Sequence, residues 1–151
     1  MSADAFHMTL PSEDGDGAKR CMSNAINDAE INPEDVGYIN AHGTSTPAGD
    51  IVEVRAIKSL FGEHSKNLTI NSTKSMIGHL LGAAGGVEAL VTILSLKNQK
   101  IHPTINVDNQ DPECDLDFNT KSSKDANINI ALSNSFGFGG TNGSLIFSKY
   151  D

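Results

Sequence analysis

The first half of the chain alternates between strand-like and helix-like spacing of hydrophobic residues. A short apolar run, Ala5-Phe-His-Met-Thr9, ends at Pro11 and predicts a strand. Residues 36–41 predict a second, buried strand. Residues 16–30 form a helical pattern whose apolar stripe consists of Ala18, Cys21, Met22, Ala25, Ile26 and Ala29. A second helix is expected to begin at Pro47 and end at Gly62, with a stripe of Ile51, Val54, Ile57, Leu60 and Phe61.

The second half continues this alternation. We expect a strand at residues 68–71 and a helix at residues 78–97. After a polar stretch a small strand is expected near residues 116–118. Two last strands, at residues 128–133 and 144–147, are joined by a glycine-rich turn. The predicted order, β-α-β-α-β-α-β-β, favours an α/β sheet covered by helices.

The helix predicted at residues 78–97 is apolar nearly all around its circumference. His79, Glu88 and three glycines, in a segment barely long enough to cross a bilayer, argue against a membrane span. A helix without a polar face has to be buried on all sides. The chain offers no obvious second helix to pack against it. Part of this helix is therefore expected to be covered by something outside the chain.

Composition indicates one globular domain with a hydrophobic core: 151 residues, of which 38% are hydrophobic and 20% charged. The formal net charge of −8 argues against nucleic acid or an anionic membrane surface as the main partner. The two cysteines, Cys21 and Cys114, have neither zinc-ligand spacing nor a disulfide framework. A reducing cytosol or organelle matrix is therefore the expected compartment.

His42 is the first candidate for chemistry. It directly follows the second predicted strand and precedes Gly43, so we expect it at the carboxyl end of the sheet, where α/β sites form. A core histidine satisfied by backbone groups is the alternative, and for a lone histidine it is the better one. Thr44, Ser45 and Thr46 either cap the following helix or donate hydrogen bonds to a polar ligand in a tunnel.

His79 lies at the predicted start of the long helix, five residues after Lys74. A helix N-terminus and a nearby cation both disfavour the imidazolium, so a neutral ring is expected to donate one N–H to a carbonyl oxygen that becomes an enolate. A packing role is the alternative, but the presence of His42, His79 and Lys74 together favours chemistry. Glu88 needs a partner inside its apolar helix. An ion pair with Lys74 and a role in supporting catalysis remain open.

The other reactive features indicate neither a covalent nucleophile nor a nucleotide site. Cys21 falls in the middle of a predicted helix, and two acidic neighbours are expected to raise the thiol pKa of Cys114. The turn Gly137-Phe-Gly-Gly140 lacks the third glycine and following helix of a dinucleotide fingerprint, and it lacks the lysine of a P-loop. Its backbone N–H groups are suited to an oxyanion site, with Phe138 as a movable wall.

Four segments in one order carry a family resemblance: Asn40-Ala-His-Gly-Thr-Ser-Thr46, Ser72-Thr-Lys-Ser-Met-Ile-Gly-His79, Gly82-Ala-Ala-Gly85 and Asn134-Ser-Phe-Gly-Phe-Gly-Gly-Thr-Asn142. This set resembles the β-ketoacyl-acyl carrier protein synthases, specifically the elongating type of bacterial and organellar fatty acid synthesis. The resemblance covers the chain from about Ser2 to Tyr150. It implies one half of the thiolase-like fold, in which two β-α-β-α-β-α-β-β halves, each a mixed sheet, pack as a five-layer αβαβα block with helices on both faces. Residues 1–151 would form the carboxyl-terminal domain, without the amino-terminal half and its nucleophilic cysteine.

Carried over position by position, the resemblance implies that His42 and His79 bind the malonyl thioester oxygen and promote decarboxylation. Lys74 would order this pair, with Glu88 behind it. Phe138 would be the gating phenylalanine, whose backbone N–H completes the oxyanion hole. The tunnel for the phosphopantetheine arm would be lined by Thr9, Thr44 and Thr46. A structural monovalent or divalent cation, seen in some members, would be held by Asn40, Glu88, Ser133 and Asn134.

The implied function is fatty acid chain elongation by decarboxylative Claisen condensation of an acyl thioester with malonyl-acyl carrier protein, giving 3-oxoacyl-acyl carrier protein. The chain alone is expected to be inactive, because the cysteine belongs to the other half. A non-catalytic thiolase-fold subunit that dimerises with an active synthase and tunes it is the alternative. Such partners often lose the histidines, so the retention of His42, Lys74 and His79 favours the enzyme.

No cofactor is expected to be required beyond the structural cation. The expected partners are acyl carrier protein bearing acyl and malonyl groups, the amino-terminal half, and a second copy in a homodimer of the intact enzyme. Neither nucleic acid nor membrane is an expected partner. The expected location is the cytoplasm of a bacterium, or the mitochondrial or plastid matrix of a eukaryote.

Overall fold

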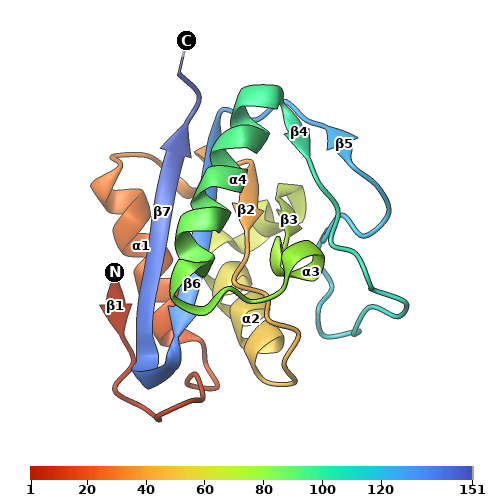
Figure 1. Cartoon of the computed structure of the whole chain (residues 1–151). Helices are drawn as coiled ribbons and strands as arrows, with labels where there is room; N and C mark the ends of the chain where they lie inside the picture. The colour runs from red at the N-terminus through yellow and green to blue at the C-terminus, as the bar shows by residue number, and fades with distance from the viewer. Residues whose placement is uncertain (151) are drawn as a thin grey trace.

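The computed structural model describes residues 1–150. Five strands form one mixed sheet in the order β1-β7-β6-β2-β3 (Figure 1). The strands are β1 (Ser2–Ala3), β2 (Tyr38–Asn40), β3 (Thr69–Asn71), β6 (Ile130–Gly137) and β7 (Thr141–Ser148). Strand β2 pairs in parallel with both β3 and β6, whereas β7 is antiparallel to both β6 and β1. The predicted α/β class with a mixed sheet is confirmed.

Helices cover both faces of the sheet (Figure 1). Helices α1 (Asp16–Asp28) and α2 (Gly49–Phe61) lie on one face, and α4 (Ala84–Asn98) lies on the other. Side chains alternate along a strand. Thus Ile39 and Leu132 belong to the core beneath α1 and α2, whereas Tyr38 and Ala131 pack with Leu96 of α4. This alternation gives the molecule two hydrophobic clusters, one on each side of the sheet.

The first two helices are close to the predicted ones. In α1 the expected stripe is buried at Ala18, Cys21, Met22 and Ile26, but the helix ends at Asp28 and leaves Ala29 exposed. Helix α2 begins two residues after Pro47 and ends at Phe61, directly before Gly62, which has a φ of 54°. Glycine is suited to that position because a side chain would strain the backbone. Short 3-10 turns, η1 (Pro33–Asp35) and η2 (Gly62–Asn67), lead into β2 and β3.

The helix predicted at residues 78–97 is not continuous, and the prediction that it starts at Gly78 is wrong. A four-residue helix, α3 (Lys74–Ile77), ends at Gly78, whose φ of 76° and ψ of 178° are not helical. His79 then lies in an irregular segment before a 3-10 turn, η3 (Leu81–Ala83), and α4 begins only at Ala84. The backbone N–H of Leu81 donates to the ring of His79, and this local bond replaces a helical one.

Helix α4 buries one side and leaves the other uncovered. Glu88, Thr92 and Leu96 face inward and are buried. On the opposite side Leu90, Ile93 and Leu94 are 55%, 44% and 45% exposed. Within residues 1–150, helix α4 is therefore not buried on all sides as the sequence predicted. No helix in this range is long and apolar enough to cross a membrane.

Two predicted strands are absent from the described residues. Residues 5–9 form an irregular, bent segment, in which Ala5 has a φ of 52° and the ring Nδ1 of His7 accepts the N–H groups of Thr9 and Leu10. Near residues 116–118 the chain makes a backbone hydrogen bond from Ile70 N–H to the Asp117 carbonyl but no strand. A small antiparallel pair that the sequence did not predict is formed by β4 (Lys100–Ile101) and β5 (Lys124–Asp125).

Strands β6 and β7 form a long hairpin. Strand β6 begins two residues later than predicted, and both strands continue further toward the turn than predicted. Their register runs from Ile130 opposite Ser148 to Gly137 opposite Thr141. The predicted glycine turn closes the hairpin as η4 (Phe138–Gly140), in which Gly139 and Gly140 have φ angles of 79° and 73°. These are left-handed conformations that favour glycine.

Candidate active site

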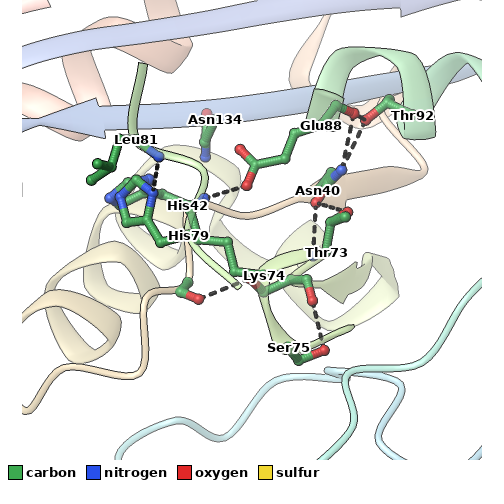
Figure 2. Close-up of polar contacts among 12 residues, drawn as sticks. Asn40, His42, Thr73, Lys74, Ser75, His79, Leu81, Glu88, Thr92 and Asn134 are labelled. Atoms are coloured by element: carbon green, nitrogen blue, oxygen red, sulfur yellow. Dashed lines mark hydrogen bonds and ion pairs between the residues drawn. The ribbon is translucent and has the colours of Figure 1, made fainter. Parts of the chain in front are cut away.

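The carboxyl ends of β2 and β3 bring three of the candidate residues into one cluster (Figure 2). His42 follows β2, Lys74 opens α3 after β3, and His79 follows α3. The imidazole rings of His42 and His79 meet edge to face, with centroids 5.6 Å apart and planes at 86°. Ligand sites of α/β sheets form at this edge of the sheet.

His42 is held in its neutral form. Burial, followed by the charges of Lys74 and His79, lowers the pKa of its imidazole to about 3. Its Nδ1 is buried and has no hydrogen-bond partner among residues 1–150. The ring of Phe136 lies 5.6 Å away at 55°. This half-buried aromatic residue was not predicted as part of the site, because strand spacing alone does not tell which ring faces a histidine.

Glu53 on α2 is a further site residue that the sequence did not reveal. Its two carboxylate oxygens accept the backbone N–H groups of His42 at 3.0 Å and Gly43 at 2.9 Å. The side-chain amide of Asn134 donates to it at 3.0 Å. Burial raises the pKa of the Glu53 carboxyl, and these three donors oppose that rise. An acidic residue in the apolar stretch Ile51–Val54 was the available signal, but the sequence could not show where its oxygens point.

The ring of His79 is oriented by a backbone group. Its Nδ1 accepts the N–H of Leu81 at 3.0 Å, so the proton of the neutral ring is on Nε2. Leu81 adopts a φ of 52°, a left-handed conformation that is strained for leucine. Because His79 lies five residues before α4, the predicted effect of a helix N-terminus on its ring does not apply. Hydrogen bonding to Nδ1 instead directs an N–H donor outward.

Lys74 and Glu88 form a buried ion pair behind the histidines (Figure 2). The Lys74 Nζ donates to Glu88 Oε1 at 2.5 Å, and the two side chains are 5% and 2% exposed. Burial raises the pKa of the Glu88 carboxyl, while Lys74 opposes the rise. The ion pair expected between these residues is therefore present. Glu88 Oε2 has no partner among residues 1–150.

The four residues proposed to hold a cation do not fit one as side-chain ligands in this arrangement. The Oδ1 of Asn40 accepts two hydrogen bonds from Thr73, and the Oδ1 of Asn134 accepts the Ser144 hydroxyl. Only Glu88 Oε2 is a free carboxylate oxygen among them. Residues 1–150 contain no group of three or more His, Cys, Asp or Glu side chains placed to hold a metal. The cation stays a prediction.

Phe138 lies at the tip of the β6–β7 hairpin with its side chain 80% exposed. The turn is tied to the amino-terminal loop. Gly139 N–H donates to the Met8 carbonyl at 2.7 Å, and Asp4 N–H donates to the Gly140 carbonyl at 2.9 Å. The turn therefore has few contacts around Phe138 and a defined connection to a second loop.

The three threonines predicted to line a tunnel do not share one cavity. A cavity of about 730 Å³ is lined by both Thr44 and Thr46, whose hydroxyls lie 3.1 Å apart, but Thr9 is not among its lining residues. Thr46 also accepts the N–H of Gly49 at 3.2 Å, so the proposed capping role is partly realised. His42 borders a separate cavity of about 50 Å³, so the larger cavity does not enclose the histidine pair.

Both cysteines are free and buried. Burial, followed by nearby carboxylates, raises the pKa of the Cys114 thiol, in the direction predicted from its acidic neighbours. A raised thiol pKa leaves little thiolate at neutral pH, so Cys114 is poorly suited to nucleophilic attack.

The chain matches the family model "Beta-ketoacyl synthase, C-terminal domain" over residues 1–108. It is 53% identical over 150 residues to proteins named 3-oxoacyl-[acyl-carrier-protein] synthase 2 from Synechocystis sp. and from Staphylococcus aureus. These matches cover 99% of this chain and 36% of each relative. The chain thus spans little more than a third of the length of these relatives.

Solved ketosynthases have the same backbone. In a structure of a type II PKS acyl-carrier protein in complex with its ketosynthase, the matched chain superposes with a TM-score of 0.96 at 42% identity. A β-ketoacyl synthase from Burkholderia phymatum STM815 superposes with a TM-score of 0.92 at 39% identity. Each match covers 99% of this chain and 36% of the other chain.

Proposed function

Because the chain belongs to the β-ketoacyl synthase family, we propose that it supplies the histidine and lysine part of an active site for decarboxylative condensation in fatty acid chain elongation. Residues 1–151 would be the carboxyl-terminal domain of a 3-oxoacyl-[acyl-carrier-protein] synthase. The acyl chain would be carried by a cysteine in the amino-terminal half. The observation that carries the proposal is the His42–His79 pair, whose ring centroids lie 5.6 Å apart, together with the buried Lys74–Glu88 ion pair.

In this proposal His79 donates its Nε2 proton in a hydrogen bond to the thioester oxygen of the malonyl group, and His42 faces the same oxygen. The bond between the malonyl α-carbon and its carboxylate breaks, carbon dioxide leaves, and the electron pair moves onto the thioester as an enolate. Donors aimed at that oxygen stabilise the charge as it develops. The enolate carbon then attacks the acyl carbonyl and releases the cysteine as a thiolate.

The neutral state of His42 supports this role. With the pKa of its imidazole lowered to about 3, the ring can interact with an enolate without first losing a proton. Lys74 contributes by its position, since its ammonium is already paired with Glu88. The Phe138 N–H would complete the oxyanion hole for the acyl carbonyl, and Thr9, Thr44 and Thr46 would contact the phosphopantetheine arm.

The rest of the proposal concerns partners and location. Acyl carrier protein would deliver both the acyl and the malonyl group, and one solved relative is a ketosynthase in complex with its acyl-carrier protein. The intact enzyme would be a homodimer and would require no cofactor. Two free, buried cysteines are compatible with a reducing compartment, the bacterial cytoplasm or an organelle matrix.

The test compares the 151-residue chain alone with the same chain joined to the amino-terminal half of a synthase 2 relative, such as that of Staphylococcus aureus. Formation of 3-oxoacyl-acyl carrier protein from acyl- and malonyl-acyl carrier protein is measured. We expect no product from the chain alone and product from the joined protein. Product from the chain alone would refute the proposal. So would a joined protein that keeps full activity when His42 and His79 are both replaced by alanine.

A further inference from the structure

The two histidines of the candidate active site are held in different ways. The ring of His79 is oriented by the N–H of Leu81, which donates to its Nδ1. The ring of His42 has no such support, because its Nδ1 is buried without a hydrogen-bond partner among residues 1–150. It packs edge to face against the His79 ring and at an angle against the Phe136 ring. The direction of the His42 ring therefore depends on how its own backbone is held.

The backbone at His42 lies just beyond the end of the sheet. The N–H of Ala41 still donates to the Asn71 carbonyl of β3 at 2.8 Å. The next two N–H groups, those of His42 and Gly43, donate instead to the side chain of Glu53. A carboxylate on α2 thus takes the place of a neighbouring strand at this point of the chain.

A carboxylate suits both N–H groups, whereas an amide does not. One oxygen of Glu53 accepts the N–H of His42 at 3.0 Å, and the other accepts the N–H of Gly43 at 2.9 Å. The first oxygen also accepts the Asn134 amide, which is turned this way because its own oxygen accepts the Ser144 hydroxyl at 2.7 Å. A glutamine would present one oxygen and one NH₂ group, so one of the two backbone N–H groups would face another donor.

The same segment is held from a second side by Ser72. The Ser72 hydroxyl donates to the Gly43 carbonyl at 2.8 Å. A Cβ atom at position 43 would lie 2.7 Å from the Cβ of Ser72, and the φ of Gly43 is 36°. Such a close approach at a positive φ favours glycine. The backbone that carries His42 is therefore fixed between α2 and the end of β3.

The energetic cost of Glu53 indicates that it does more than fill space. The residue is only 4% exposed, and none of the ion pairs among residues 1–150 includes it. Burying a carboxylate without a cation is unfavourable, and an apolar side chain between Val52 and Val54 would be buried at less cost. What the carboxylate adds is a fixed place for two backbone N–H groups.

We propose that Glu53 is a positioning residue, which sets the direction of the His42 ring through the backbone N–H groups of His42 and Gly43. This inference deepens the function proposed above and rests on it, because the ring is to face the thioester oxygen of the malonyl group. Glu53 acts only through the backbone, to which both of its oxygens are bonded. A misplacement of about 1 Å can cost roughly 100-fold in rate, so the malonyl step depends on this hold.

The first test is amide hydrogen exchange, followed by NMR, in the 151-residue chain and in its Glu53→Gln variant. Ala41 is the internal reference, because its N–H donates to the Asn71 carbonyl. At His42 or Gly43 the variant should exchange about tenfold faster or more relative to Ala41, as expected when a hydrogen bond to a charged group is lost. Cross-peaks between the rings of His42 and Phe136 should weaken. Unchanged exchange ratios, or unchanged ring contacts, would overturn the proposal.

Phe61→Leu is the matched control for a general loss of stability. Phe61 is buried at the other end of α2 and borders neither of the two cavities described above. Its truncation should destabilise the fold by removing packed atoms and leave the exchange ratios unchanged. If Glu53→Gln does not fold, the wild type decides. A scalar coupling across the hydrogen bond from the His42 nitrogen to the Glu53 carboxyl carbon is expected, and its absence would overturn the proposal.

Kinetics of the joined synthase separate positioning from a loss of folded protein. We expect Glu53→Gln to lower the kcat of malonyl decarboxylation by roughly 10- to 100-fold and to affect acyl transfer to the cysteine much less. Phe61→Leu should change both steps equally or not at all. Equal losses of the two steps in Glu53→Gln would show a merely structural role and overturn the proposal. If the joined wild-type synthase is inactive, the proposed function fails, whereas the exchange measurements still test how His42 is held.

Discussion

At the scale of single residues, the two histidines differ in how their rings are held, and this difference predicts separate roles. His79 has its Nδ1 occupied by Leu81 N–H and presents Nε2–H outward, so it is a fixed donor. In the joined synthase, His79→Ala should reduce malonyl decarboxylation by roughly 100- to 1,000-fold, the usual cost of losing one oxyanion donor. Transfer of the acyl chain to the cysteine should be much less affected. Equal losses in the two steps would show that His79 does not belong to the malonyl step.

The lowered pKa of His42 predicts a dependence of stability on pH. The unfolded imidazole takes up its proton near 6.5, but the folded one does so only near 3. Between these values the unfolded chain binds more protons, so the free energy of unfolding falls as the pH falls. Lowering the pH from 7 to about 5 should therefore reduce the free energy of unfolding of the wild type by about 2 kcal/mol more than that of His42→Gln. Urea unfolding of both proteins at the two pH values measures the difference, and equal losses would contradict the assignment.

Residue types in the site could be predicted from the sequence, but their orientations could not. His42, Lys74 and His79 were identified from their order and from the turns around them. Glu53 was missed because its role depends on two backbone N–H groups that it meets only after α2 packs beside the end of β2. The strained Leu81, which orients His79, was missed because nothing in its side chain indicates a positive φ.

At the scale of elements, strong periodicity gave reliable predictions, and local hydrogen bonds decided the exceptions. Helices α1 and α2 follow clear apolar stripes and agree with the prediction within a few residues. The apolar character of residues 78–97 concealed a break, because glycine at 78 and the bond from Leu81 to His79 act on the backbone and leave the hydrophobic pattern unchanged. Strands β4 and β5 have two residues each, too few to give any period.

The turn at Phe138 is predicted to act as a gate. Gly139 has a φ of 79°, and its neighbours allow the turn to change conformation at little steric cost. With its ring 80% exposed, Phe138 contributes little to the core of this chain. Phe138→Ala in the joined synthase should therefore alter the handling of acyl chains or the order of substrate entry and leave the free energy of unfolding nearly unchanged. If structures of the free and acylated enzyme showed the same Phe138 rotamer and the same turn conformation, Phe138 would not be a gate and would have only a packing role.

At the scale of the whole molecule, the outer side of α4 is an apolar surface that the rest of the chain leaves uncovered. Leu90, Ile93 and Leu94 are about half exposed there, and Leu81 in the preceding turn η3 is 79% exposed. An apolar surface of this kind marks a place where another protein surface binds or where copies associate. In the proposed synthase the amino-terminal half would cover this surface, because the resemblance implies a thiolase-like fold in which the two halves pack against each other. The chain by itself should therefore associate or bind a hydrophobic dye.

Replacing Leu90, Ile93 and Leu94 together with glutamine should reduce that association. Glutamine is a good helix former, so α4 should be retained while its outer surface becomes polar. Met8→Gln is the matched control, because Met8 is an even more exposed apolar residue that lies in the amino-terminal loop, away from α4. Sedimentation velocity over a range of concentrations and fluorescence of a hydrophobic dye measure the effect. We expect the wild type and Met8→Gln to associate and bind dye, and the triple variant to do so much less. A wild-type chain that is monodisperse as a monomer and binds no dye would mean that the outer side of α4 needs no cover, and would count against a site completed by a second half.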